Sequence, residues 1–371
     1  MKIGITGQNG FVGAHLYNSI RLYPTEFEQI DFRKEYFDDD EKLDQFVAQC
    51  DVIVHLAAMN RHESEQVIYD TNIGLVNKLV ASLDRTGSKA HVLISSSTQE
   101  ERDNLYGRSK REGREALNKW ANENGGKLTG LLIPNVFGPF GKPFYNSFVA
   151  TFCSQLTHGE RPTIANDGEV KLIYVQELVD DIIEQIREGE HRPLYVVEPT
   201  AIKKVSEVLG LLEHYKDLYL AKGEVPVLND RFELNLFNTY RSFMDHKAIY
   251  PRKFQLHADP RGTFVEIIRM GIGGQSSYST TVPNITRGNH FHTRKIERFA
   301  VIQGKALIQL RKIDSDEVMD FYLDGSTPSY VDMPIWYTHN ITNVGDNELI
   351  TMFWINEPYD PSDPDTYFLE V

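Results

Sequence analysis

Three things are scarce in this sequence: cysteine, positive charge and long apolar runs. The 371 residues include only Cys50 and Cys153, too few for a disulfide framework or a zinc ribbon. Lysine and arginine total 39 against 53 acidic residues, a net charge of −14 that repels phosphodiester backbones. No stretch approaches the roughly 18 consecutive apolar residues of a membrane span, and the opening MKIGITGQNG indicates strand and turn, not a secretion signal. We therefore expect a cytoplasmic protein that binds neither nucleic acid nor membrane.

Hydrophobic residues, at 41% of the chain, are plentiful enough for a core in each of two domains. Up to about residue 240, apolar runs of strand length alternate with longer amphipathic segments. This alternation predicts an α/β Rossmann-type domain with a doubly wound parallel sheet. The predicted strands include 3–5, 52–54, 91–94 and 131–133, and the predicted helices include 65–83 and 110–121.

Beyond residue 255 the pattern changes to short strands separated by turn residues, which predicts an all-β sandwich or barrel. The predicted strands include 263–268, 298–302, 306–311 and 349–354. Little periodicity remains between Ser242 and Pro251, so we place the boundary at 245 to 252. The expected domains are residues 1–245 and 250–371.

A glycine-rich turn directly follows the first predicted strand and opens a helix. Gly7, Gly10 and Gly13 allow a tight turn, a close approach of backbone to pyrophosphate, and close packing of helix on strand. The alternative is a glycine-rich turn without a ligand. In this context the pattern predicts a dinucleotide site contacted by Gly7, Asn9, Gly10, Phe11 and Gly13.

The GxxGxxG spacing resembles that of the extended short-chain dehydrogenase/reductase family, and further segments strengthen the resemblance. His55–Ala58 ends a strand, Asn72 lies in the next helix, Tyr106–Lys110 forms a YxxxK pattern, and Pro134–Pro139 resembles a segment of nucleotide-sugar members. Tyr174–Glu177 departs from the family, whose members often have a histidine and an aspartate there. The resemblance implies additional cofactor contacts from Leu56, Ala57, Lys110 and Pro134.

The YxxxK pattern places Tyr106 and Lys110 on one helix face, because residues four apart are neighbours there. A nearby ammonium group favours the ionised phenol and lowers its pKa towards neutrality, so Tyr106 can protonate a ketone oxygen as hydride arrives. The alternative is an exposed helix pair. By the family pattern Ser97 holds that oxygen, but the nine positions from Ser97 to Tyr106 are a short separation, so Ser96 or Thr98 remain alternatives.

Cofactor choice depends on the end of the second predicted strand. An acid there, such as Asp31, binds a ribose 2′-hydroxyl, whereas an arginine binds a 2′-phosphate. We favour Arg33 and hence NADPH, because Arg33 and Lys34 are adjacent cations in an acidic protein. The alternative is that all three are ordinary surface charges.

The second half contains three histidines and a glutamate in a recognisable arrangement. His290 and His292 share one face of a predicted strand, Glu297 follows, and His339 comes later. Three imidazoles and one carboxylate suit Zn²⁺ or another divalent transition metal. The spacing resembles the two cupin motifs, with Trp336 where the family usually has glycine, and implies a double-stranded β-helix, or jelly roll. The alternative is that the histidines are merely packed or exposed.

A second resemblance overlaps the cupin motifs. The segments 259–266 and 287–290 look like those of the sugar-nucleotide 3,5-epimerases. The resemblance implies that Arg261 binds the substrate diphosphate. Those enzymes use the histidine matching His290 as their base, which a metal-bound His290 could not readily be. Glu266 is another candidate base, with an ion pair to Arg261 as the alternative reading.

A reductase followed by a cupin-type epimerase resembles the bifunctional enzymes of capsular polysaccharide synthesis. The resemblance implies C3 epimerisation of a UDP-2-acetamido-2,6-dideoxy-hexos-4-ulose, then reduction of the 4-ketone by NADPH, towards UDP-N-acetyl-L-fucosamine. It also implies a homodimer formed through the cupin. Two alternatives are retained: a 4-ketoreductase whose metal-binding cupin is structural, and a regulatory protein that senses NADP without turnover.

Overall fold

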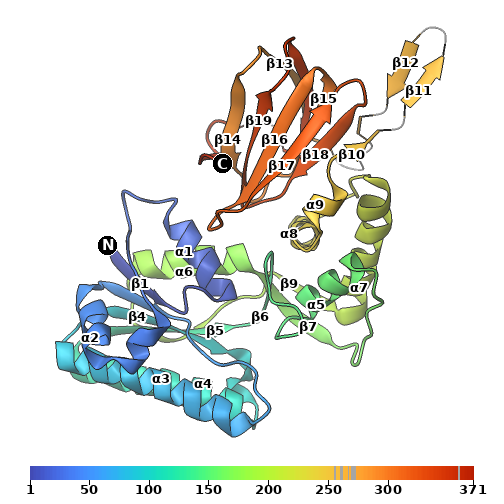
Figure 1. Ribbon diagram of the computed structural model, residues 1–371. Coiled ribbons are helices and arrows are strands. Elements are labelled where there is room, and N and C mark those ends of the chain that lie inside the picture. The colour runs from blue at the N-terminus through green and yellow to red at the C-terminus, as the bar shows by residue number, and fades with distance from the viewer. Residues whose placement is uncertain (255, 260–261, 266, 269–272, 358–359) are drawn as a thin grey trace. The chain divides into compact units, whose positions relative to one another are not determined.

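A computed structural model describes the chain except residues 255, 260–261, 266, 269–272 and 358–359 (Figure 1). By its internal contacts the chain divides into two compact units. The first comprises residues 1–151 and 164–205, and the second comprises residues 152–163 and 206–371. Each unit is described separately below.

The first unit is built on a six-stranded parallel sheet of strand order β2-β1-β3-β4-β5-β8. Its strands are β1 (Lys2–Thr6), β2 (Glu28–Ile30), β3 (Val52–His55), β4 (His91–Ser97), β5 (Lys127–Ile133) and β8 (Arg192–Val196). The helices are α1 (Phe11–Ile20), α2 (Asp40–Gln49), α3 (Glu65–Thr86), α4 (Leu105–Asn124) and α6 (Val175–Glu188), with 3-10 turns η1 (Lys34–Asp38) and η2 (Thr98–Glu101). A small sheet joins β6 (Asn135–Phe137), β7 (Glu169–Tyr174) and β9 (Ala201–Lys204). The predicted Rossmann-type fold is confirmed.

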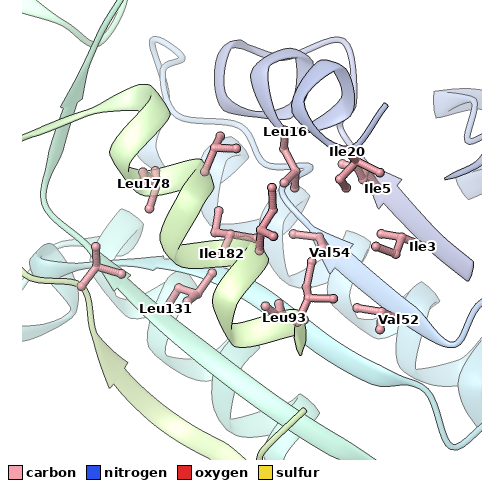
Figure 2. Packing of buried hydrophobic residues seen from close by; sticks show 14 of the residues in the cluster. Ile3, Ile5, Leu16, Ile20, Val52, Val54, Leu93, Leu131, Leu178 and Ile182 are labelled. Atoms are coloured by element: carbon pink, nitrogen blue, oxygen red, sulfur yellow. The ribbon is translucent and has the colours of Figure 1, made fainter. Parts of the chain in front are cut away.

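Apolar side chains cover both faces of this sheet, which is why its strands are almost uniformly hydrophobic. On one face, strand residues such as Ile3, Val54 and Leu131 pack against Leu16 of α1 and Ile182 of α6 (Figure 2). The opposite face packs against α2, α3 and α4 in a second cluster. Because side chains alternate along a strand, β1 contributes to the first cluster at every second residue.

The second unit contains two five-stranded antiparallel sheets. One has the order β10 (Arg252–Lys253), β18 (Ser329–Met333), β15 (Glu297–Gln303), β20 (Leu349–Ile355) and β13 (Gln275–Thr281). The other has the order β17 (Val318–Asp324), β16 (Lys305–Lys312), β19 (Tyr337–Asn343), β14 (Thr286–Phe291) and β21 (Tyr367–Phe368). Buried residues of both sheets, among them Phe299, Val301, Ile308 and Ile341, share one core. The predicted all-β jelly-roll class is confirmed.

Helical residues that precede the sandwich also belong to the second unit. They form α7 (Val205–Tyr215), the π-helical turn η3 (Lys216–Leu220), α8 (Arg231–Arg241) and α9 (His246–Ile249), while α5 (Phe148–Thr157) begins in the first unit. Arg241 Nη2 donates to the Met333 carbonyl at 3.0 Å, and Tyr219 hydrogen-bonds Asp332. The predicted domain boundary at 245 to 252 is a statement about where the chain can be divided into two fragments that fold, and it stays a prediction.

The scarcity of cysteine and of long apolar runs can be compared with the structure. Cys50 and Cys153 are both buried free thiols, as expected. Within the described ranges, no helix combines the length and the apolar character needed to cross a membrane.

Candidate functional site

The glycine turn after β1 has a shape that side chains would obstruct. Gly7 has φ of +78°, and a Cβ there would lie 2.8 Å from the Ala57 amide nitrogen. On Gly13 a Cβ would lie 2.1 Å from the Gly7 carbonyl oxygen, which itself accepts a 2.9 Å hydrogen bond from the Gly10 amide. The turn therefore brings β1 and the start of α1 together as a dinucleotide-binding turn requires. Asn9 is exposed and Phe11 half-buried at its rim.

The chain after β3 runs beside this turn. Thr6 anchors it, because the Thr6 carbonyl accepts from the Leu56 amide at 3.1 Å and the Thr6 hydroxyl accepts from the Ala57 amide at 3.4 Å. Asn72 of α3 holds the next residues: its side-chain oxygen accepts from the Met59 amide at 2.7 Å, and its nitrogen donates to the Met59 carbonyl at 3.1 Å. Leu56 and Ala57 thus lie at the glycine turn, and Pro134 is buried directly after β5. Their contacts with a cofactor stay predictions.

Tyr106 and Lys110 lie one turn apart near the start of α4, which Asn104 caps by accepting from the Gly107 amide at 2.7 Å. The Tyr106 hydroxyl donates to Asn60 Oδ1 at 3.3 Å, and Ser97 lies close enough to lower the pKa of Tyr106. The structure therefore places the Tyr106 phenol near Ser97 and on the same face of α4 as Lys110. The contact from Asn60 has no separate signal in the sequence.

The electrostatic state of this pair differs from the prediction. Burial raises the pKa of Tyr106 to about 12, with Tyr145 adding to the rise and Ser97 opposing it. Burial also lowers the pKa of Lys110 to about 8, against the influence of Glu100. Lys110 Nζ lies 5.9 Å from the Tyr106 ring centre and donates instead to the Ser95 carbonyl at 3.1 Å. In this arrangement desolvation outweighs any lowering of the Tyr106 pKa by Lys110, and Tyr106 is held as a protonated donor.

The three candidate hydroxyls, at the end of β4 and the start of η2, occupy different surroundings. Ser97 accepts from the Gln99 amide at 3.2 Å and reaches Tyr106. Ser96 points to the other face of β4 and hydrogen-bonds Glu100, which forms a buried ion pair of 2.7 Å with Arg114. Thr98 is exposed in η2. Of the three, Ser97 is the one that lies beside Tyr106, and its catalytic role stays a prediction.

The residues predicted to select the cofactor, Asp31 and Arg33, follow β2. Arg33 is exposed immediately before η1, and the preceding Phe32 amide donates to Gln8 of the glycine turn at 3.4 Å. Asp31 accepts from the Tyr17 hydroxyl at 3.4 Å and lines a hollow of about 440 Å³ between α1, β2 and α2. Asp31 and Arg33 thus flank Phe32, the residue that touches the glycine turn.

In the second unit, the four predicted metal ligands come together at the sandwich. One donor atom from each of His290, His292, Glu297 and His339 lies within 4.8 Å of every other. Glu297 Oε2 lies 3.1, 3.3 and 3.9 Å from the Nε2 atoms of His292, His339 and His290. Strand register creates the cluster, because His290 of β14 pairs directly with His339 of β19 after an irregularity at Asn289, whose φ is +58°.

The donor set fits a divalent metal ion. The Nδ1 atoms of His292 and His339 lie 2.5 and 3.2 Å from the carbonyls of Asp365 and Tyr337, a pairing that directs each Nε2 lone pair inward. His339 Nε2 is buried and makes no hydrogen bond of good geometry within the described part of the chain. A buried nitrogen acceptor beside a carboxylate and two further imidazoles suits Zn²⁺ coordination.

Burial and mutual charge set the protonation of these groups. Burial lowers the pKa of His290 to about 4, and neighbouring His339 lowers it further, so this imidazole is neutral at physiological pH. Burial alone would raise the pKa of Glu297, but His292 and His339 outweigh it and hold that pKa below its usual range. A neutral imidazole and an ionised carboxylate are the forms that bind metals.

Two predicted residues cannot be placed. Arg261 and Glu266 lie outside the described residues, so substrate binding by Arg261 and the base role of Glu266 stay predictions. They flank the described strand β12 (Gly262–Val265), which pairs antiparallel with β11 (Leu256–Asp259).

These features define a class: a Rossmann-type protein with a serine, a tyrosine and a lysine at the end of β4 and the start of α4, joined to a β-sandwich with a candidate metal centre. Residues 3–197 match the model of the NAD dependent epimerase/dehydratase family, and residues 257–367 match the polysaccharide biosynthesis C-terminal domain. The chain belongs to the NAD dependent epimerase/dehydratase family, which supports a nicotinamide cofactor.

Similarity to particular proteins extends over the whole chain. A UDP-2-acetamido-2,6-beta-L-arabino-hexul-4-ose reductase of Pseudomonas aeruginosa is 32% identical, over 100% of this chain and 99% of the relative. The crystal structure of the capsular polysaccharide assembling protein CapF from Staphylococcus aureus matches with a TM-score of 0.63 and 35% identity, covering 100% of both chains. RMD from Pseudomonas aeruginosa, at 18% identity, covers 58% of this chain and 85% of its own with a TM-score of 0.53, which supports the fold of the first half.

Proposed function

We propose that the protein is a bifunctional nucleotide-sugar enzyme. The cupin-like sandwich epimerises C3 of a UDP-2-acetamido-2,6-dideoxy-hexos-4-ulose, and the Rossmann unit then reduces the C4 ketone with NADPH, towards UDP-N-acetyl-L-fucosamine. The observation that carries the proposal is Tyr106, a buried protonated phenol that contacts Ser97 one helical turn from Lys110. The full-length relative named as a hexul-4-ose reductase supports the substrate class.

In the reduction, the residues of the first unit hold the ketone and supply its proton. NADPH, when bound at the glycine turn, supplies the hydride. The Ser97 hydroxyl donates to the ketone oxygen, and Tyr106 transfers its proton to that oxygen as negative charge develops there. Lys110, a cation below its pKa of about 8, stabilises the resulting phenolate.

In the epimerisation, the second unit needs a base beside C3 and a group that stabilises the enolate oxygen. A divalent ion held by His290, His292, Glu297 and His339, most simply Zn²⁺, would polarise the keto oxygen. Arg261 is proposed to bind the diphosphate. Because the 4-keto group is what acidifies the C3 proton, epimerisation has to precede the reduction that removes this ketone.

Isotope exchange tests the proposal directly. The enzyme is incubated in D₂O with the UDP-4-keto sugar, with and without NADPH, and deuterium at C3 is followed by NMR. We expect C3 exchange without NADPH, and NADPH oxidation together with C4 reduction when it is present. NADPH oxidation without any C3 exchange would support the single-activity ketoreductase. The absence of both reactions would support the NADP-sensing alternative.

The preference for NADPH is proposed to depend on Arg33, because Asp31 is engaged with Tyr17. Replacing Arg33 with alanine is expected to weaken NADPH binding by about 1.5 to 3 kcal/mol, the usual contribution of a charged hydrogen bond. NADH binding is expected to change little, and Lys34→Ala serves as the neighbouring control. Equal weakening of both cofactors in fluorescence titrations would exclude contact with the 2′-phosphate.

A homodimer through the sandwich is also proposed. In the described residues, β11 and β12 pair with each other and with no further strand, and an isolated hairpin is marginally stable in water. The edge strand β13 exposes Tyr278, with 71% of its surface accessible. Pairing with a second copy would cover such surfaces, and analytical ultracentrifugation of the full chain should find a dimer. The protein is expected to act in the cytoplasm.

A further inference from the structure

Two of the four metal-site donors are joined by a short loop whose conformation decides their separation. His292 follows β14, Glu297 begins β15, and residues 293–296 connect them without regular structure. None of the backbone hydrogen bonds found in the described part of the chain lies within residues 293–296, so the source of the loop's order lies elsewhere in the chain.

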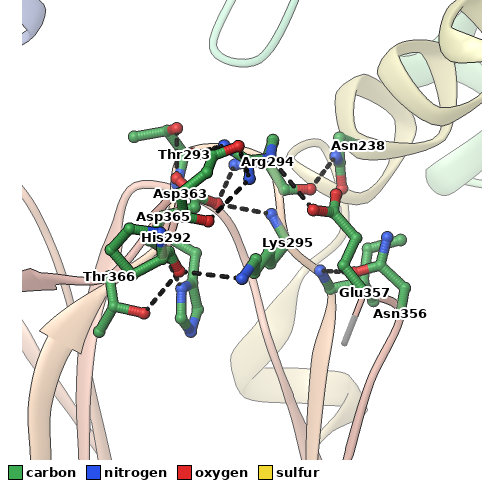
Figure 3. A network of polar contacts seen from close by, with 12 residues as sticks. Asn238, His292, Thr293, Arg294, Lys295, Asn356, Glu357, Asp363, Asp365 and Thr366 are labelled. Carbon is green, nitrogen blue, oxygen red and sulfur yellow. Dashed lines mark hydrogen bonds and ion pairs between the residues drawn. The ribbon is translucent and has the colours of Figure 1, made fainter. Parts of the chain in front are cut away.

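That source is Asp365, which is distant in sequence and 2% exposed. Figure 3 shows its side chain beside Thr293, Arg294 and Lys295. Asp365 Oδ1 accepts from the Thr293 amide at 3.0 Å and from the Thr293 hydroxyl at 2.6 Å. Oδ2 accepts from the amides of Arg294 and Lys295, both at 3.0 Å. One carboxylate therefore occupies the concavity formed by three successive backbone N–H groups, an arrangement that favours anions.

The main chain of the same residue contacts a metal-site imidazole. The Asp365 carbonyl oxygen lies 2.5 Å from His292 Nδ1. If Nδ1 carries the ring proton and donates it to this carbonyl, Nε2 is left as a lone-pair donor towards the site. Asp365 thus fixes both the loop after His292 and the tautomer of its ring.

The backbone of Asp365 shows that this position is constrained by its contacts. Its φ is +42°, in the left-handed region that non-glycine residues seldom occupy. Such conformations persist where surrounding interactions hold them, and they gather at functional sites. Asp365 accepts five hydrogen bonds, and these hold its backbone in this conformation.

Neighbours of Asp365 make further contacts with the same loop. Lys295 Nζ donates to the Pro364 carbonyl at 2.9 Å, and Arg294 pairs with Asp363 at 2.7 Å. Strand β21 then pairs with β14, placing Phe368 opposite His290. The segment from Asp363 to Phe368 therefore lies against the loop and the strand that carry three of the four donors.

We infer that Asp365 is a positioning residue of the metal centre: through the 293–295 amides and His292 it holds His292 and Glu297 in coordinating positions. The inference rests on the proposed metal site and adds to it a residue that supplies no ligand atom. It predicts that metal affinity depends on a side chain that never touches the ion. Residues in such supporting positions change metal affinity by about 10- to 100-fold when replaced.

Full-length Asp365→Ala and Asp365→Asn proteins test this, with Asp363→Ala as the matched control. Zn²⁺ affinity is measured by competition with a chromogenic chelator, and the visible spectrum of Co²⁺-loaded protein reports ligand geometry. We expect about 10- to 100-fold weaker Zn²⁺ binding and an altered Co²⁺ spectrum for Asp365→Ala. Asp365→Asn, which keeps the shape and one acceptor oxygen, should lie between it and wild type. Asp363→Ala loses an exposed ion pair and should change affinity by less than about threefold.

The outcomes separate this inference from the proposed metal site. Wild-type affinity and spectrum in folded Asp365→Asn and Asp365→Ala would overturn the role of Asp365 and leave the metal site intact. A wild-type protein that binds no Zn²⁺ or Co²⁺ would overturn both. Circular dichroism of the metal-free proteins identifies any variant that fails to fold, and Asp365→Asn then decides the matter because it preserves the volume of the side chain.

Discussion

The two halves of the molecule assemble their reactive groups in opposite ways. In the Rossmann unit, Tyr106 and Lys110 are one helical turn apart, and the glycine turn is continuous in sequence. In the sandwich, His290 and His339 meet through strand register, and Asp365 reaches the site from the end of the domain. The first site is ordered mainly by local chain geometry, and the second by pairing between distant strands.

Burial also serves opposite purposes in the two sites. It raises the pKa of Tyr106 to about 12, which keeps an acid protonated until it is needed. It lowers the pKa of His290 to about 4, which keeps a base free of its proton. Each low-dielectric setting favours the neutral form, and the neutral form is the proton donor in one case and the metal ligand in the other. The comparison predicts that the two sites can be disabled separately.

The largest difference between the effects on the two reactions is expected from Tyr106→Phe. This change removes the proton donor and leaves the glycine turn intact, so reduction should fall by about 10²- to 10⁴-fold with nearly unchanged NADPH affinity. C3 exchange in D₂O should continue, since the sandwich does not contain this residue. NADPH oxidation followed by absorbance measures the first effect and NMR the second. Near-normal turnover would eliminate Tyr106 as the donor.

Metal removal should have the complementary effect. Protein purified at neutral pH without chelator is expected to carry one divalent ion per chain, most simply Zn²⁺. Stripping it should abolish C3 exchange and destabilise the sandwich by about 4 kcal/mol where free metal had been near 1,000 times its Kd. NADPH binding by the Rossmann unit should persist. Elemental analysis that finds no stoichiometric metal would count against the centre, and thermal unfolding with and without chelator measures the stability change.

The same contrast explains how much could be predicted from sequence. The parallel sheet, the all-β second half and the four-donor cluster follow from periodicity and motif spacing, and the structure bears out the fold and the proximity of the donors. Residues whose roles depend on distant partners gave no such signal. Asn60 and Asp365 are ordinary polar residues in the sequence, and only the folded chain places them beside Tyr106 and His292.

Burial was equally hard to predict. Spacing alone suggested that Lys110 would lower the pKa of Tyr106, but the lysine is itself buried and donates to the Ser95 carbonyl. Desolvation then dominates the pKa of both groups. A helix pattern reports which residues share a face, but it does not report how deeply that face is covered.

Fragments test where the two halves can be divided. The sequence predicts an autonomous epimerase beginning near Ser242, yet such a cut removes Arg241, which donates to the Met333 carbonyl, and Tyr219, which hydrogen-bonds buried Asp332. Asp332 keeps its ion pair with Arg298, so the cost is that of the lost hydrogen bonds to charged groups, about 1.5 to 3 kcal/mol each. A fragment of residues 206–371 should therefore be more stable than one of residues 242–371 by at least that amount. Urea unfolding measures the difference.

Both fragments are loaded with metal and assayed for C3 exchange without NADPH, and residues 1–245 should bind NADPH without exchange. Tyr219→Phe in the longer fragment is the matched control, because it removes the hydroxyl that contacts Asp332 and leaves the helices in place. Equal stability of the two fragments would place the boundary at 245 to 252 after all. An inert, folded, metal-loaded fragment beside an active intact enzyme would show that the sandwich is not an autonomous epimerase.

The smallest effect expected is a difference in pH dependence between the two reactions. Burial lowers the pKa of Lys110 to about 8, so the lysine is a cation below that pH and becomes neutral above it. Tyr106 keeps its proton throughout this range because its pKa is raised to about 12. Reduction should therefore decline above pH 8, by roughly tenfold per pH unit once the lysine is largely neutral, through loss of the cation that stabilises the phenolate.

Lys110→Arg provides the control for this decline, because arginine stays charged across the whole range. Its residual reductase activity should be flat from pH 7 to pH 10, while C3 exchange by the sandwich, which lacks Lys110, should not follow the wild-type reductase profile. Rates are measured at saturating NADPH, with cofactor affinity checked at each pH. A wild-type reduction rate that stays constant to pH 10 would show that the Lys110 charge does not act in catalysis. Ser97 and Asn60 would then be the groups that act on Tyr106 in catalysis, and the contrast drawn above between the two sites would be weaker.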